Sequence, residues 1–252
     1  GMLTNTTMRM FRHTLFWGGV MLVSLAAAAT ADDYAQARQQ LLEIIQQDVS
    51  DTSLYLDKEA LDPRVMATIG KVPRHQFVPA AQRHKAYINR PLPIGYGQTI
   101  SQPYIVALMT DLIKPQPDDR VLELGTGSGY QAAILAELTG QVYSIEIIEA
   151  LGKEAQERLS RLDYNNITLR IGDGYYGWEE HAPFDAIVVT AAASHVPPPL
   201  VEQLKPGGRM VIPVGSRFLT QQLLLIEKQA DGQVITRQIL PVKFVPLTGE
   251  HD

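Results

Sequence analysis

A glycine-rich turn between a buried strand and a helix constrains this chain more than any other feature. The apolar run 121–124 leads into Gly125-Thr-Gly-Ser-Gly129, and a helical pattern begins at Gln131. Alternate glycines let the backbone adopt left-handed conformations and approach a ligand closely. A dinucleotide turn that starts at Gly125 would need a third glycine at position 130, where Tyr130 stands. The turn therefore predicts a ligand site that is not a dinucleotide site, with a plain tight strand–helix junction as the alternative.

Composition limits the classes of protein that this chain can belong to. Its 252 residues, 45% hydrophobic and 19% charged, suit one α/β domain with a sizeable core. The net charge of −5 and the lack of a basic block predict no nucleic-acid partner. The absence of cysteine excludes disulfides, thiolate metal sites and a cysteine nucleophile. The six histidines show no metal-ligand spacing, so no metal is expected.

Residues 1–31 form a separate segment. Gly1 before Met2 is typical of a scar left by tag cleavage, and residues 2–31 have the basic, apolar and small-residue regions of an export signal. The alternative is a retained helix. The apolar stretch 15–29 is short for a membrane span, so we expect no stable span in the mature chain. Residues 32–252 are expected to form a single domain.

Hydrophobic patterns after residue 32 predict N-terminal helices followed by a doubly wound, mostly parallel seven-stranded sheet. Helical spacing covers 34–49, 63–69, 103–113 and 150–162, while 71–97 is rich in proline and glycine and predicts loops. Strands separated by helices imply parallel pairing. The last two strands are close in sequence and predict an antiparallel hairpin. The expected strands are 121–124, 142–147, 167–171, 184–190, 210–214, 222–227 and 234–240.

Three consecutive strand ends carry groups that suit an adenosyl ligand. The first is the glycine turn, the second is Glu146, and the third is Asp173 between Gly172 and Gly174. In a doubly wound sheet these ends lie at one edge, where Glu146 could accept hydrogen bonds from ribose hydroxyls and Asp173 from an adenine amino group. Taken singly, Glu146 could be an exposed strand-end acid and Asp173 an Asx turn. The spacing of Glu123 and the three glycines resembles the first motif of class I S-adenosylmethionine methyltransferases.

Motifs along most of the chain resemble the protein-L-isoaspartate (D-aspartate) O-methyltransferase family. Thr99-Ile-Ser101 upstream of the sheet and Val245-Pro-Leu-Thr248 at the tail are the most restrictive of them. The chain departs from the family in its export-like leader, and Tyr104 stands near where many relatives have histidine. The resemblance covers about residue 35 to the end, through residues 73–79, 98–103, 121–133, 172–174, 189–193, 204–209 and 244–248.

The resemblance implies methyl transfer from S-adenosylmethionine to the free carboxylate of L-isoaspartyl and D-aspartyl residues in damaged proteins, which initiates repair and leaves S-adenosylhomocysteine. It implies that Ser101 is catalytic, although Ser101 could instead only cap the next helix. Val245 and Leu247 would bind the peptide, or else pack in the core. The implied cofactor-binding residues are Thr99, Ile100, Gln102, Glu123, Gly125, Thr126, Gly127, Gly129, Glu146, Ile147, Asp173, Gly174 and Thr248. Residues 32–115 would form the substrate side and residues 116–252 the cofactor-binding sheet.

Two other functions fit the same pattern. One is a different class I methyltransferase that acts on RNA or a small molecule, and the other is a non-catalytic methyltransferase-like module. We expect activity in the cytoplasm, because the cofactor is made there and its charge hinders passage through a bilayer. Export to the periplasm through residues 2–31 is the alternative.

Overall fold

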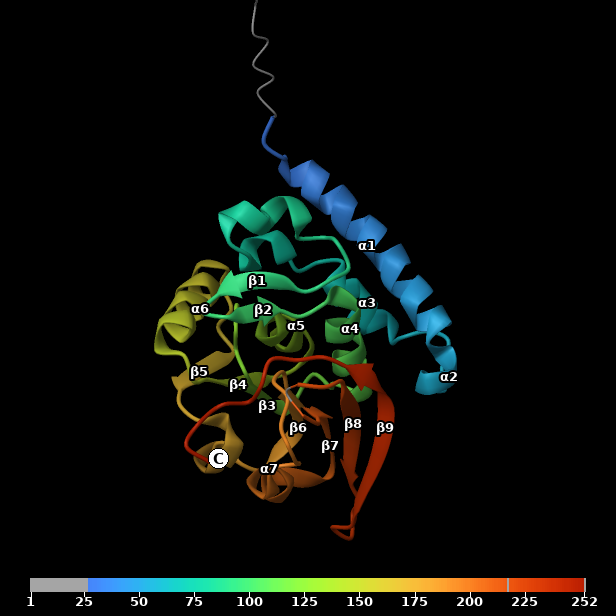
Figure 1. Cartoon of the computed structure of the whole chain (residues 1–252), viewed down its shortest axis with the longest axis vertical. Helices are drawn as coiled ribbons and strands as arrows, with labels where there is room; N and C mark the ends of the chain where they lie inside the picture. Colours follow the sequence, from blue (N-terminus) through green and yellow to red (C-terminus); the bar gives the residue numbers. More distant parts are fainter. Residues whose placement is uncertain (1–26, 217, 252) are drawn as a thin grey trace, which may run out of the picture.

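A computed structural model describes residues 27–216 and 218–251 of the chain (Figure 1). Most of the leader predicted over residues 2–31 lies outside these residues. None of the helices in the described part of the chain combines the length and apolar character that crossing a bilayer requires.

The described residues contain a mixed seven-stranded sheet with the order β5-β4-β3-β6-β7-β8-β9. The first five strands in this order are parallel, β8 runs antiparallel to both neighbours, and the predicted β8–β9 hairpin is confirmed. The order reverses at β3, which lies between β4 and β6, and a crevice is expected there at the carboxyl ends of the strands. The strands are β3 (Arg120–Leu124), β4 (Gln141–Glu146), β5 (Ile167–Ile171), β6 (Phe184–Val189), β7 (Leu204–Val214), β8 (Gln221–Lys228) and β9 (Val234–Val242).

Apolar side chains cover both faces of the sheet. Successive residues of a strand point to opposite faces, so Val121 packs in one core cluster while Leu122 and Leu124 pack in the other. The first cluster includes the N-terminal helices, and the second includes Leu200 and Trp178. The α-helices are α1 (Ala31–Asp51), α2 (Ser53–Leu56), α3 (Pro63–Ile69), α4 (Pro103–Leu112), α5 (Tyr130–Leu138), α6 (Glu149–Arg161) and α7 (Pro198–Gln203).

Helix α1 is longer than its apolar pattern predicts. Leu41, Ile45 and Val49 are buried at a spacing of four, which places them on one face of the helix along the side of the molecule in Figure 1. The extra turn at the start comes from a capping box, in which Thr30 accepts from the Asp33 backbone and Asp33 accepts from the Thr30 backbone.

The proline- and glycine-rich region is more ordered than its composition predicts. It contains the antiparallel hairpin of β1 (Leu92–Gly95) and β2 (Gln98–Ile100), together with the 3-10 helices η1 (Arg74–Phe77) and η2 (Ala80–Lys85). Strands this short lack a periodicity that a sequence pattern can detect. Two further 3-10 helices, η3 (Gly174–Tyr176) and η4 (Glu179–His181), follow β5.

Strand β7 begins six residues before the predicted start at position 210. Leu204 already pairs with Phe184, and a register shift then absorbs Gly207 and Gly208. Glycines normally weaken a strand assignment, and here they mark the irregularity instead.

Candidate cofactor and substrate site

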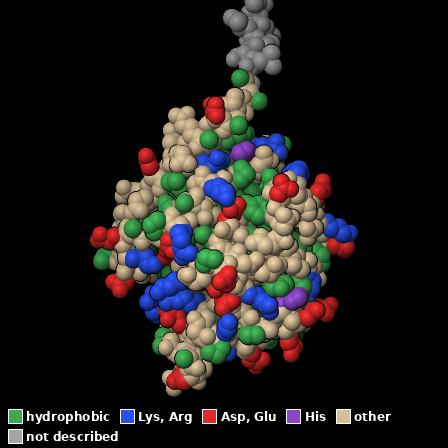
Figure 2. Space-filling view, turned by 180° about the vertical axis from the view of Figure 1, so that it is seen from behind, with side chains coloured by type: hydrophobic (Ala, Val, Ile, Leu, Met, Phe, Trp, Pro, Cys, Tyr) green, Lys and Arg blue, Asp and Glu red, His purple; other side chains and the backbone are tan. Residues whose placement is uncertain are grey.

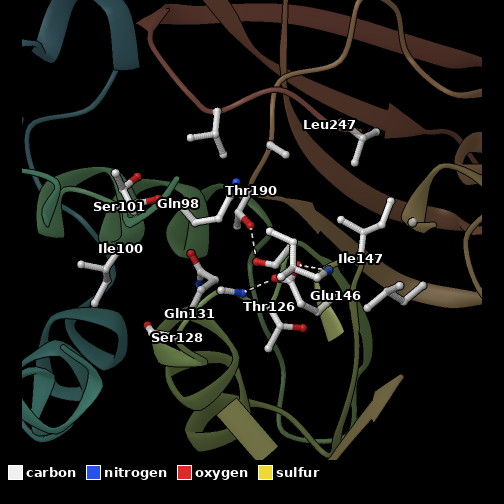
Figure 3. A pocket seen from close by; sticks show the side chains of 18 of the residues that line it. Gln98, Ile100, Ser101, Thr126, Ser128, Gln131, Glu146, Ile147, Thr190 and Leu247 are labelled. Atoms are coloured by element: carbon white, nitrogen blue, oxygen red, sulfur yellow. Dashed lines mark hydrogen bonds between the residues drawn. The ribbon is translucent and has the colours of Figure 1, made fainter. Parts of the chain in front are cut away.

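A pocket that opens to solvent lies at the carboxyl edge of the sheet (Figure 3). The turns after β3, β4, β5 and β6 form its floor and sides, and the segment around β2 and the C-terminal tail complete it. Of the predicted residues it brings together Thr99, Ile100, Ser101, Gly125, Thr126, Gly127, Glu146, Ile147, Gly174, Val245, Leu247 and Thr248.

The glycine turn after β3 fits the floor of this pocket only because Gly125 has no side chain. Its φ is +89°, and a Cβ atom there would lie 2.6 Å from Oγ1 of Thr190. That hydroxyl lies 2.7 Å from the Gly125 carbonyl oxygen, and the Gly125 N–H donates to Ile145 at 2.9 Å. The turn is therefore held by both neighbouring strands. Gly129, with φ +91°, ends the turn as the N-cap of α5 and does not line the pocket.

Glu146 lies at the end of β4, and its residue is only 5% exposed. Its Oε1 accepts from the Gly127 N–H at 2.8 Å and its Oε2 from the Ile148 N–H at 2.9 Å. Each oxygen of a carboxylate can accept a second hydrogen bond. The carboxylate therefore ties the glycine turn to β4, and it keeps accepting capacity for a ligand in the pocket (Figure 3).

Glu123 lies beneath the pocket and does not line it. The residue is completely buried, and its Oε1 accepts from the Ser144 hydroxyl, which also contacts the hydroxyl of Thr126. The pKa of Glu123 is raised to about 8, chiefly by burial and to a smaller extent by the nearby Glu146, against the lowering effect of the Ser144 hydrogen bond. Glu123 does not line the pocket, but Thr126 does. Glu123 therefore supports the glycine turn indirectly, through Ser144 and Thr126.

Asp173 also lies outside the pocket lining, although Gly172 and Gly174 beside it are part of that lining. Its carboxylate accepts from the Tyr175 N–H at 3.0 Å, so the Asx-type turn is present. The other partner is His251 of the C-terminal tail, whose Nδ1 lies 2.8 Å from Oδ2. The tail leaves β9, crosses the edge of the sheet and reaches the turn after β5 (Figure 1).

Ser101 lies between β2 and α4, where two cavities meet. It lines the main pocket and also a neighbouring cavity, whose walls include Gln102 and the strand-end residues 241–245. Gln102 is the N-cap residue of α4, and its own side chain makes no capping hydrogen bond. The N–H of Tyr104 in the first turn donates to Oδ1 of Asn89 at 3.0 Å instead, so Ser101 does not cap this helix. The side chain of Ser101 is thus directed to the boundary between the cavities (Figure 3).

The tail residues Val245 and Leu247 are held through their backbones. The Ala192 N–H donates to Val245 at 2.7 Å, and the Leu247 N–H donates to Ala192 at 2.8 Å. This strand-like pairing brings residues 245–248 to the pocket.

Several pocket residues were not predicted from the sequence. Gln98, Ser128, Gln131, Thr190 and Ala191 all line the pocket. Gln98 and Ser128 adjoin predicted residues, whereas Gln131, Thr190 and Ala191 lie within the stretches 121–133 and 189–193 that resemble the family. These neighbouring residues and motifs were the available signal. Tyr104, in contrast, points away from the pocket, and its hydroxyl contacts Thr52 on the far side of α4.

The pocket and sheet define a class I S-adenosylmethionine methyltransferase fold, which solved structures share. A protein-L-isoaspartate O-methyltransferase structure matches with a TM-score of 0.74 and 27% identity over 84% of this chain and 66% of that chain. A Plasmodium falciparum structure in complex with S-adenosyl-L-homocysteine matches with a TM-score of 0.69 and 28% identity, over 84% of this chain and 98% of that chain.

Sequence comparison identifies the family within this class. The family model for protein-L-isoaspartate(D-aspartate) O-methyltransferase matches residues 52–252. A similar curated relative is Protein-L-isoaspartate O-methyltransferase 2 of Syntrophobacter fumaroxidans, 64% identical over 236 residues, which cover 92% of this chain and 96% of the relative. The chain belongs to the protein-L-isoaspartate(D-aspartate) O-methyltransferase family.

The buried carboxyl of Glu123 predicts a specific pH dependence of stability. In the unfolded chain its pKa is near the ordinary value of 4.5, whereas the native pKa is about 8. Between these two pKa values the unfolded chain releases a proton that the native protein keeps. The contribution of this group to the free energy of unfolding is therefore fully present below pH 4.5 and is lost as the pH rises through 8. Glu123→Gln should flatten this decline in urea unfolding curves measured from pH 5 to 8. Parallel curves for the two proteins would show that Glu123 does not hold the proton.

Proposed function

We propose that the pocket holds S-adenosylmethionine and that Ser101 orients the isoaspartyl carboxylate beside its methyl group. The chain is thus an S-adenosylmethionine-dependent protein carboxyl O-methyltransferase that methylates L-isoaspartyl residues and begins their repair. Family membership carries the activity. The meeting of two cavities at Ser101 is the observation that supports the arrangement of the reactants.

The chemistry of the lining fits an adenosyl cofactor. Glu146 has accepting capacity for two ribose hydroxyls, and Gly172 and Gly174 on either side of Asp173 line the pocket, where a flat base would lie against their backbone. Gln131 lines the pocket, and its Oε1 is buried without a hydrogen-bond partner in the described part of the chain. A buried acceptor of this kind calls for a donor from a ligand or an ordered water. The ammonium of the methionyl part would provide such a donor.

Asp173 would bind the adenine amino group less directly than the sequence predicts. Its carboxylate is engaged by His251 and the Tyr175 N–H, so an adenine amino group would share it with the tail. Gly129 and Glu123 would act through the shape of the turn, since neither lines the pocket.

The second cavity suits the peptide. The residues that line both cavities would form the common wall between cofactor and substrate, and they are Thr99, Ser101, Thr190 and Val245. The Ser101 hydroxyl would donate to one carboxylate oxygen and leave the other free to attack. Val245 and Leu247 would flank the peptide on a tail segment that already pairs in a strand-like way, and backbone pairing tolerates varied side chains.

Alignment accounts for the reaction without a general base. A carboxylate with a pKa near about 4 is ionised at neutral pH and is already nucleophilic. The bound cofactor supplies an electrophilic methyl group on a positively charged sulfur. The residues of the chain need only hold the carboxylate oxygen in line with it and exclude water. In the resulting methyl ester, the next backbone amide nitrogen attacks the ester carbonyl and displaces methanol, which gives a succinimide. Water then reopens the succinimide in part as normal aspartate.

The two parts of the domain divide this work. We assign residues 32–115 to the substrate side, because Thr99, Ser101 and Gln102 come from it, and residues 116–252 to the cofactor-binding sheet. The tail of the second part adds residues 245–248 to the lining of the pocket.

Family membership favours this activity over the two alternatives. On the face shown in Figure 2, acidic and basic side chains are intermixed, which offers no extended basic surface for RNA there. A non-catalytic module would not need the carboxylate of Glu146 or the glycine turn in place. The described residues also bring no three histidine or acidic side chains together as a metal site would.

Glu146→Ala should weaken the binding of S-adenosylhomocysteine by about 1.5–3 kcal/mol, the range for hydrogen bonds to a charged group. Titration calorimetry on the folded variant measures the change. Glu227→Ala, which removes an acid paired with Arg209 outside the pocket, is the matched control and should bind normally. Wild-type affinity in Glu146→Ala would remove this residue from the cofactor site.

Ser101→Ala should lower kcat on an isoaspartyl peptide by about tenfold or more, because a misaligned reactant costs up to about a hundredfold. Cofactor affinity should change much less. Ser194→Ala is the control, since its hydroxyl bonds His195 outside both cavities. Unchanged turnover in Ser101→Ala would mean that the hydroxyl does not orient the substrate.

We propose that the enzyme acts in the cytoplasm, where its cofactor is made, although residues 2–31 have the pattern of an export signal. Cell fractionation followed by N-terminal sequencing tests the proposal. The activity and the chain are expected in the cytoplasmic fraction. A periplasmic chain that begins near Asp32 would establish export instead.

A further inference from the structure

Arg74 is a completely buried cation in the first 3-10 helix, η1. Its guanidinium donates to three main-chain carbonyls: Nε to Ala86 at 2.8 Å, and Nη2 to Ser101 at 2.9 Å and to Arg90 at 3.5 Å. These three carbonyls belong to the end of η2, the loop before β1 and the segment before α4. One side chain thus joins three stretches of the substrate-side segment.

No carboxylate forms an ion pair with Arg74 among residues 27–216 and 218–251. Burial lowers its pKa to about 10, so it stays charged at neutral pH. Burying a charge without a counter-ion is costly, and apolar residues of similar size often replace buried charges without loss of stability. General packing alone therefore gives a weak reason for an arginine at this position.

The guanidinium also contacts the cofactor-binding part of the domain, residues 116–252. Its central carbon lies 5.0 Å from the ring centroid of Tyr130, a cation–π distance. Tyr130 is the first residue of α5, directly after the glycine turn, and it lines the main pocket. Phe77 of η1 packs edge-on against the same ring. Arg74 therefore lies between the backbone of Ser101 and the start of the helix that follows the cofactor turn.

We infer that Arg74 is a positioning residue that sets the distance between Ser101 and the cofactor by holding the Ser101 carbonyl against Tyr130. Its planar fork reaches several carbonyls at once, which a lysine ammonium on a flexible stem does not reproduce. The inference rests on the proposed role of Ser101, because Arg74 acts on the substrate through that residue.

A double-mutant cycle between Arg74→Lys and Ser101→Ala tests this coupling. In the wild-type background, Arg74→Lys should lower kcat on an isoaspartyl peptide by about tenfold to a hundredfold, as expected for misalignment. The KM for S-adenosylmethionine should change little, since the contacts of Glu146 are intact. In the Ser101→Ala background, the same substitution should change kcat by less than about twofold, because the hydroxyl that Arg74 positions is already gone. A change of about twofold is no larger than the usual error of additivity between mutations.

Arg38→Lys is the matched control. Arg38 also donates to a main-chain carbonyl, that of Gly70, and to the Tyr87 hydroxyl, but it contacts no residue of either cavity. It should alter the melting temperature without lowering kcat. If Arg74→Lys folds poorly, Arg74→Met removes the buried charge at similar length, and the cycle is repeated with it.

The outcomes separate this inference from the function on which it rests. If Ser101→Ala impairs turnover and the Arg74 substitution lowers kcat by the same factor in both backgrounds, the positioning role is wrong while the role of Ser101 stands. If Ser101→Ala turns over like the wild type, both roles are wrong. If Arg74→Lys lowers only the melting temperature, as Arg38→Lys should, Arg74 serves stability alone.

Discussion

The close passage of the Gly125 backbone beneath Thr190 is the constraint on which the site depends. With φ at +89° and no room for a Cβ, the chain can turn from β3 into α5 over the carboxyl edge of the sheet. The same turn is bonded to β4 through Ile145 and Glu146. The floor of the pocket, the placement of Glu146 and the start of α5 all follow from this geometry. Any side chain at Gly125 would disturb all three together.

The site joins segments that are far apart in the sequence. The segment before α4 provides Ser101, the sheet provides the turns, and the tail after β9 returns across the sheet edge through its pairing with Ala192. This arrangement explains why a methyltransferase sheet needs the additional N-terminal residues. The sheet can hold a cofactor, but the wall between the two cavities comes largely from outside it.

Much of this site could be predicted from the sequence, because the strand ends carry the chemistry. The glycine turn and Glu146 follow buried apolar runs, and parallel pairing brings such ends to one edge. The β1–β2 hairpin was missed because its strands are too short to show a period. The role of Arg74 could not be predicted, because its hydrogen bonds go to backbone carbonyls, which any residue type provides, and its contact with Tyr130 depends on the tertiary fold. The contact of His251 with Asp173 likewise depends on where the tail ends in space.

The central claim is that alignment of an ionised carboxylate, rather than acid–base chemistry, drives methyl transfer. The most direct measurement compares labelled methyl transfer to two peptides of identical composition, one with an isoaspartyl linkage and one with normal aspartate. Both carboxylates are ionised at neutral pH, and they differ by the position of one methylene. Alignment predicts that the normal peptide reacts slower by on the order of a hundredfold. Equal rates for the two peptides would contradict the account.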